Sequence, residues 1–192
     1  MALFMCNTSN VHEMKFGRPQ TVLNNEERPN GVIVTLGATQ EGTARELDHV
    51  HAITEGALTA VAGKFIVVAP EINVQQYRKI DGQIGKFVLE AGETYSAYQL
   101  SVLDRLEYSD AYFKNASALK RGDKVNVQAK EVGKQERFVK AETGGCLRII
   151  SIVDLWLPVM LAPNGVVDGQ ASGQPALLMP ESCKMIKVEV VE

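Results

Sequence analysis

Short runs of β-branched residues bounded by turn formers constrain the fold of this chain more than any other feature. The strongest is Lys64–Ala69, where Phe-Ile-Val-Val makes a continuous apolar run that is stopped by Pro70. Apolar runs of this length and type are typical of strands that are buried on both faces. We therefore predict a strand over 64–69 whose two faces are both covered.

Other segments carry related strand patterns. The run Val32–Leu36 is β-branched, follows turn residues and is closed by Gly37. Residues 124–130 and 185–191 alternate apolar and polar side chains, which is the two-residue period of a strand with one wet face. No segment sustains a period near 3.6. These features predict about seven to ten short strands in a mainly β fold, either a β-sandwich or a β-barrel.

Turn chemistry adds local predictions. Residues 87–89 and 94–100 carry β-formers on both sides of the turn Glu90–Glu93, which predicts a hairpin. Ser109 and Asp110 are candidates to cap a helical turn over 111–113. Arg121-Gly122-Asp123 matches a known integrin-binding tripeptide, but before an alternating strand it indicates a turn. Residues 162–165, Ala-Pro-Asn-Gly, predict another reversal, and 57–61 fits either a helical turn or a strand.

Residues 1–30 differ in character from the rest of the chain. They combine turn formers with apolar residues that are placed singly, at Phe4, Val11, Phe16, Val22 and Leu23. This pattern suits an extended arm across another surface, a set of short edge strands, or a loosely packed terminus. We predict an extended N-terminal arm over 1–30 and a β-rich body over 31–192, with a possible sub-division near 115–122.

Charge and hydropathy bound the partners. The net charge is −3, from 20 Lys and Arg against 23 Asp and Glu, and the basic residues are scattered. Binding to nucleic acid requires a concentrated positive surface, so no nucleic-acid partner is predicted. The apolar stretch 149–160 is interrupted by Ser151, Asp154 and Pro158, well short of the roughly 20 apolar residues of a membrane span. We expect no membrane association.

Asp48-His49-Val50-His51 is the cluster that most resembles a metal site. Two histidines at i and i+2 on a strand point the same way and could share an ion. No third ligand lies near them in the sequence, which favours a solvated or interface strand.

Cys146 follows two glycines and could present a thiol beside backbone donors, but a catalytic base is missing. The three cysteines Cys6, Cys146 and Cys183 are far apart and without C-x-x-C spacing, so free buried thiols are expected. Neither a phosphate-binding loop nor a serine nucleophile elbow occurs. We predict no catalytic, cofactor-binding or metal residues and no enzymatic activity.

A cluster of aromatic residues fits an interface or a core equally well. Its members are Tyr95, Tyr98, Tyr108, Tyr112 and Phe113.

Three segments together carry a family resemblance. They are Phe65–Glu71, ending in Val-Ala-Pro-Glu, then Phe87–Glu93 with Phe-x-Leu-x-Ala-Gly, and Tyr98-Gln-Leu100 followed by Tyr108-Ser109, with a weaker echo in 187–191. Over roughly residues 60 to 130 the chain resembles small structural proteins that tailed bacteriophages encode beside their major capsid protein.

The resemblance implies a virion structural protein, made in the host cytoplasm. Its expected role is capsid decoration or cementing: it would bind the major capsid protein on the capsid exterior and form a homo-oligomer. Two alternatives stay open. One is another virion component, such as a tail-tube or head–tail connector protein. The other is a metal- or ligand-binding β-barrel that uses His49 and His51.

Overall fold

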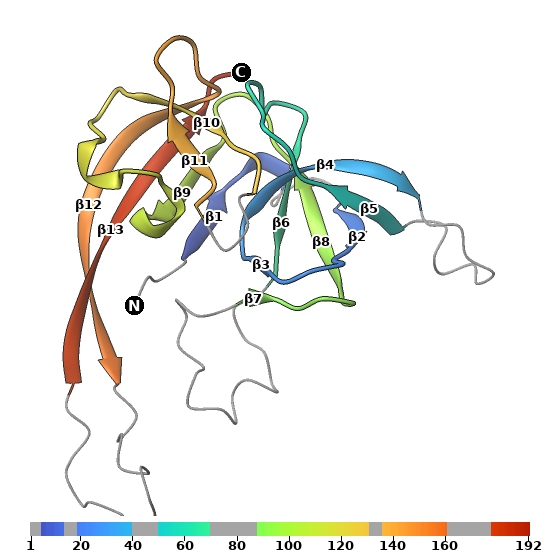
Figure 1. The fold of residues 1–192 in the computed structure, drawn as a ribbon, viewed down its shortest axis with the longest axis horizontal. Helices are drawn as coiled ribbons and strands as arrows, with labels where there is room; N and C mark the ends of the chain where they lie inside the picture. The colour runs from blue at the N-terminus through green and yellow to red at the C-terminus, as the bar shows by residue number, and fades with distance from the viewer. Residues whose placement is uncertain (1–4, 14–18, 40–49, 70–87, 131–135, 161–177) are drawn as a thin grey trace, which may run out of the picture.

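The chain folds into a closed five-stranded barrel and a six-stranded sheet that pack side by side (Figure 1). The structure is a computed structural model, which describes residues 5–13, 19–39, 50–69, 88–130, 136–160 and 178–192, the last residues of β12 and the first of β13 (156–160 and 178–182) by their backbone only. The predicted mainly β fold is confirmed. In these ranges no helix has the length and apolar character needed to cross a bilayer.

The barrel consists of five strands in the order β2-β5-β4-β6-β8. β2 runs parallel to β5, and the other neighbours in the barrel are antiparallel. Alternate residues of these strands fill the interior with buried apolar side chains, among them Val22, Val34, Val67 and Ala97. The bounds are β2 Gln20–Leu23, β4 Val32–Thr39, β5 Val50–Thr54, β6 Phe65–Val68 and β8 Thr94–Gln99.

The six-stranded sheet has the order β1-β9-β13-β12-β10-β11, and all its neighbours are antiparallel. A small separate sheet pairs β3 with β7, and two short 3₁₀ turns, η3 and η4, follow β9. The bounds are β1 Cys6–Asn10, β3 Arg28–Pro29, β7 Val88–Leu89, β9 Arg105–Ser109, η3 Asp110–Tyr112, η4 Ala116–Ala118, β10 Lys124–Val127, β11 Phe138–Lys140, β12 Leu147–Met160 and β13 Leu178–Val190.

One hydrophobic core joins the barrel to the sheet. Ile33 and Ile66 point out of the barrel and pack in the same cluster as Tyr108 and Ile186 of the sheet. Their neighbour Val67 points the other way, into the barrel. Ile66 and Val67 are both fully buried, so the prediction that the strand at 64–69 is covered on both faces is confirmed.

Buried tyrosines fasten the turn between β3 and β4 to the sheet. The Tyr108 hydroxyl donates to the carbonyl of Gly31 at 2.9 Å, and the Tyr112 hydroxyl donates to the carbonyl of Asn30. Burial raises the pKa of Tyr108 well above its ordinary value, which keeps this donor protonated. The Tyr108 ring lies 4.7 Å from that of Phe138, centroid to centroid. For the cluster around Tyr108, the core interpretation of the aromatic residues is therefore the one observed.

The extended N-terminal arm over residues 1–30 is not confirmed. β1 pairs with β9 at the edge of the six-stranded sheet, and β2 is a barrel strand between β5 and β8. Val11 and Val22 are fully buried, one in each core. Of the singly placed apolar residues, Val22 and Leu23 belong to the short strand β2 and Val11 directly follows β1, whereas Phe4 and Phe16 lie outside the described residues. The alternative of short strands therefore describes this region better.

The hairpin predicted over 87–100 is wrong. β7 pairs with β3, whereas β8 pairs with β2 and β6. Asn24 explains why the two segments separate at the turn: its backbone N–H donates to the Glu93 carbonyl at 2.9 Å, and its carbonyl accepts from Gly92 at 2.6 Å. The turn therefore bonds to the β2–β3 connection, and its two flanks enter different sheets.

The remaining local predictions had mixed outcomes. η3 forms the helical turn expected after Ser109, but the Ser109 side chain makes no capping hydrogen bond. Leu58 forms an isolated bridge with Val127, so this part of 57–61 is extended. β13 confirms its alternating strand, with Val188 fully buried, and β10 confirms the other over Lys124–Val127, with Val125 fully buried, but this strand ends before Ala129, which is exposed. The reversal predicted at 162–165 lies outside the described residues.

Candidate functional site

The histidine cluster is only partly within the described residues. His51 lies on β5, is half-buried, and places Nδ1 3.3 Å from the Gly37 carbonyl. His49 and Asp48 lie outside the described residues. Within the described part of the chain, no three His, Cys, Asp or Glu side chains gather closely enough to hold a metal ion.

Cys146 is arranged as a core thiol. Its Sγ lies 3.4 Å from the Val125 carbonyl, and burial raises the pKa of the thiol. A nucleophilic cysteine requires the thiolate, which burial disfavours. Gly144 and Gly145 have φ of +73° and +109°, so they turn the chain between β11 and β12. This geometry gives no support to a nucleophile at Cys146.

The Arg121-Gly122-Asp123 tripeptide is a turn, as predicted. Gly122 has a φ of +90° and donates its N–H to the Ile149 carbonyl at 2.9 Å. The Asp123 carboxylate accepts from Lys140 Nζ at 2.7 Å and from the Lys120 backbone N–H at 2.9 Å. These bonds hold the pKa of Asp123 below its ordinary value, the Lys140 contact being the largest cause.

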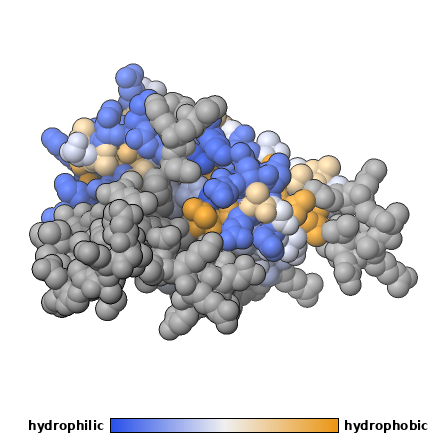
Figure 2. All heavy atoms as spheres, turned by 60° about the horizontal axis from the view of Figure 1, so that its bottom comes forward, coloured by the Kyte–Doolittle hydropathy of each residue, from blue (hydrophilic) through white to orange (hydrophobic). Residues whose placement is uncertain are grey.

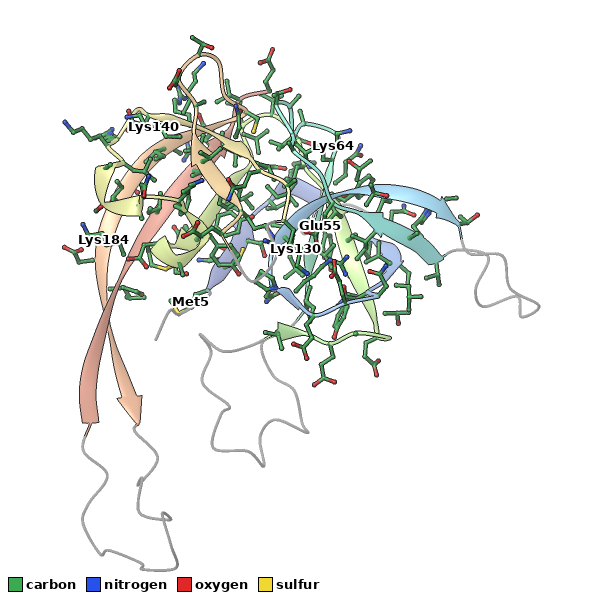
Figure 3. The ribbon with its side chains drawn as sticks, in the orientation of Figure 1. Met5, Glu55, Lys64, Lys130, Lys140 and Lys184 are labelled. Carbon is green, nitrogen blue, oxygen red and sulfur yellow. The ribbon has the colours of Figure 1, made fainter. Side chains whose placement is uncertain are left out.

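A buried ionic cluster joins the barrel to the sheet. Arg28, between β2 and β4, donates to Glu55 just after β5, and Arg137 before β11 lies 3.7 Å from the other oxygen of Glu55. The side chains of both arginines are only 3% exposed. Arg28 also donates to Asn24, Asn25 and Glu26. Figure 3 places Glu55 near Lys130, which pairs with Glu26 at 2.7 Å.

This cluster is structural in character. Glu55 is shared between two buried cations, Arg28 before β4 of the barrel and Arg137 before β11 of the sheet. Each partner therefore holds the others in place. Buried charges of this kind are costly to separate and fix relative orientation. We therefore assign the cluster to the junction and look elsewhere for a functional surface.

The face of the six-stranded sheet turned away from the core, called the outer face here, carries ordered rows of side chains. In one row, Ser151, Lys187, Glu107 and Asn7 lie opposite one another across β12, β13, β9 and β1. Glu107 accepts from Asn7 Nδ2 at 3.1 Å and pairs with Lys187 Nζ at 2.6 Å. The charges in this row are therefore paired with one another.

Neighbouring rows on the outer face differ in polarity. On one side, Glu189 accepts from Arg148 and Arg105, and these bonds lower the pKa of Glu189, with Arg148 as the largest cause. On the other side, Val153 lies opposite Met185. A hollow of about 420 Å³ lies over this polar-to-apolar boundary. Its lining residues are Asn7, Glu107, Ser151, Val153, Leu155, Met185 and Lys187.

The chemistry of this hollow suits a contact surface. The charged groups along the lining, Glu107 and Lys187, are committed to each other. Val153 is 58% exposed, so the hollow offers an apolar surface beside a closed ion pair. In Figure 2 hydrophilic residues cover much of the described surface, with hydrophobic residues in a few small patches.

β12 and β13 continue beyond the rest of the sheet as a two-stranded ribbon (Figure 1). β9 pairs with β13 only from Met185 to Glu189. The further pairs, from Asp154 with Lys184 to Met160 with Leu178, have no third strand among the described residues. In Figure 3 the Lys184 side chain lies on the side of the ribbon away from the barrel.

Sequence reasoning missed both the ribbon and the buried ionic cluster. Ser151, Asp154 and Pro158 suggest an interrupted apolar run, yet Ser151, Val153 and Leu155 share one face of a single long strand. That period of two was the available signal. The charges of Arg28, Glu55 and Arg137 are far apart in the sequence, and nothing local indicates that they meet.

The fold defines a mainly β protein with a barrel, a sheet and a projecting ribbon. No known protein family, no curated protein and no solved structure matches this chain.

Proposed function

We propose that this chain is a non-enzymatic virion structural protein of a tailed bacteriophage. Its role is to decorate the capsid exterior, where it binds the major capsid protein, associates with further copies of itself and stabilises the shell. The proposal combines the sequence resemblance over residues 60 to 130 with the shape of the β12–β13 ribbon.

The ribbon is the observation that carries the proposal. A two-stranded antiparallel ribbon has two open edges and is marginally stable by itself in water. From Asp154 and Lys184 outward, β12 and β13 pair only with each other within the described residues. A structure of this kind gains stability when another surface covers it. A shell of repeated subunits offers that surface at many equivalent positions.

The outer face supplies the contact chemistry beside the ribbon. Its apolar members Val153 and Met185 lie next to the paired charges of Glu107 and Lys187. An apolar centre with a polar border is the usual composition of a protein–protein interface. The closed barrel, in contrast, is filled by its own side chains, which gives the alternative of a ligand-binding barrel no support in the described residues.

Capsid binding tests the proposal. Purified protein is incubated with empty capsids, and co-sedimentation and the temperature of shell disruption are measured. We expect binding and a raised disruption temperature. Met185→Glu, which places a charge in the apolar part of the outer face, should abolish both effects. Val102→Lys alters an exposed valine in the β8–β9 turn and should change neither.

The outcomes separate the proposed role from its alternatives. Absence of wild-type binding, with no gain in heat resistance, would refute capsid decoration. Rings or stacked tubes of the free protein in electron microscopy would favour a connector or tail-tube role. Stoichiometric metal in protein purified without an affinity tag would favour a metal-binding barrel.

A further inference from the structure

Among the described residues, no strand covers the outer edge of β12 over most of its length. β10 pairs with Leu147 and Arg148 at the start of β12, and the turn at 122–123 bonds to Ile149. From Ile150 onward, no strand among the described residues pairs with this edge. A free edge presents a row of backbone N–H and C=O groups that can accept another strand.

A proline pair limits how much of this edge can be used. Pro158 lies directly opposite Pro180. Because neither proline has an N–H, the two cannot form a hydrogen-bonded pair, and their backbone groups face outward from the ribbon. Each outer edge of the ribbon therefore lacks a backbone N–H donor at the position of its proline. The part of the β12 edge that can accept another strand is 150–157. By the same alternation, the backbone N–H and C=O groups of residues 152, 154 and 156 point to this outer edge.

We propose that two copies of this chain pair through this edge of β12. The two strands run antiparallel about a twofold axis, with Val153 of one copy opposite Val153 of the second copy. The pairing specifies the self-association within the proposed function, although the argument for it uses only the geometry and composition of the edge.

The register follows from the edge itself. The middle of the usable segment falls between Val153 and Asp154. Centring the pair on Asp154 would place two carboxylates directly opposite each other, which is destabilising. Centring it on Val153 places Asp154 opposite Ile152. The backbone groups of both residues point to the outer edge, so the two can exchange both backbone hydrogen bonds. The edge is thus complementary to itself in one register.

The apolar side chains agree with this register. Val153 is 58% exposed and lies opposite Met185 within the ribbon. The twofold pair would extend this into a continuous row of Met185, Val153, Val153 and Met185 across four strands. The central pair is of the non-hydrogen-bonded type, where opposing side chains approach most closely. Pairing would therefore bury an apolar side chain that the single chain leaves in water.

Sedimentation of the free protein tests the pairing. We expect the wild type to be a dimer. Val153→Lys should raise the dimer dissociation constant at least about tenfold, because two ammonium groups would then be opposed. Val102→Lys is the matched control, since Val102 is 54% exposed and lies in the β8–β9 turn. Circular dichroism would confirm that both variants fold.

A cross-link provides a second measurement. In a non-hydrogen-bonded pair the opposing Cα atoms are about 4.5 Å apart, within the range of a disulfide. Oxidised Val153→Cys should give a covalent dimer on a non-reducing gel, whereas Val102→Cys should not. A monomeric wild type, or a dimer that persists in Val153→Lys, would overturn the pairing. Because the free protein is used, failure to bind capsids would leave this result unaffected.

Discussion

The Tyr108 hydroxyl on β9 donates a hydrogen bond to the backbone carbonyl of Gly31, 2.9 Å away in the β3–β4 turn. Both residues are buried. Tyr108 belongs to the six-stranded sheet, and Gly31 directly precedes β4, a strand of the barrel. Together with the bond from the Tyr112 hydroxyl to the Asn30 carbonyl, this bond connects the sheet to the barrel through the β3–β4 turn.

Removing the Tyr108 hydroxyl should therefore destabilise the whole protein. Tyr108→Phe leaves the Gly31 carbonyl buried without this donor, and a loss of about 1 to 3 kcal/mol is expected. Urea unfolding measures the change. Tyr98→Phe, at a half-buried tyrosine of β8, is the control and should have the smaller effect. Equal losses in the two variants would contradict the role of the bond.

Gly31 should tolerate alanine far less well than Gly92 does. Both glycines have positive φ, +81° and +85°. A Cβ on Gly31 would lie 2.3 Å from Cys6 Sγ, whereas nothing lies within 4 Å of one on Gly92. Gly92→Ala should cost about 1 to 2 kcal/mol from the backbone conformation alone, and thermal unfolding of Gly31→Ala should show a clearly larger loss.

A double variant isolates the steric part of that loss. Cys6→Ala removes the Sγ atom, so in the Gly31→Ala background it should recover part of the lost stability. The Cβ of Cys6, 2.7 Å from the added methyl, would still oppose full recovery. An additive double variant would show that the clash is not the cause.

The buried ionic cluster at the junction should respond strongly to loss of Glu55. Glu55→Gln leaves the charges of Arg28 and Arg137 buried without their shared anion, and a cost of about 3 kcal/mol is expected. Lys130→Ala removes the partly exposed pair with Glu26 and should cost less than about 1 kcal/mol. Chemical denaturation of the two variants compares them. Similar costs would mean that burial does not govern this cluster.

Glu189 should contribute to stability in a pH-dependent way. The hydrogen bond from Arg148, and after it that from Arg105, hold the pKa of Glu189 below its ordinary value of 4.5. A carboxyl whose folded pKa is lowered stabilises the protein above its unfolded pKa, and the contribution is lost as pH falls through the folded pKa. Glu189→Gln should therefore be less stable at neutral pH and lose less stability on acidification.

Unfolding free energies at neutral pH and at about pH 3 would measure this effect. Glu142→Gln, at an exposed glutamate before β12, is the control and should keep the wild-type acid dependence. If Glu189→Gln keeps the same dependence as the wild type, the ion pairs of Glu189 are not responsible.

The sequence predicts which faces of strands are buried better than which strands are neighbours. Alternation at Ile186, Val188 and Val190, and the run through Ile66 and Val67, correctly indicated burial because the two-residue period reports the face of a strand. Pairing depends on distant segments. The bonds of Asn24 to Gly92 and Glu93 place β7 and β8 in different sheets, and no local pattern shows this.

The candidate site was beyond sequence reasoning for the same reason. Asn7, Glu107 and Lys187 form one row because three strands from distant parts of the chain align in register. Each residue alone looks like an ordinary solvated side chain. The ribbon can be recognised only from the strand pairing, because β9 pairs with β13 no further than Met185.

The position of β1 has a consequence for how the protein folds during synthesis. Cys6 pairs with Tyr108, which in turn pairs with Ile186. β1 must therefore wait until β13 has been synthesised before the whole sheet can form. Such long-range pairing slows folding, and nascent chains lacking β13 would expose β9 to wrong partners. Productive folding is expected only after β13 has left the ribosome.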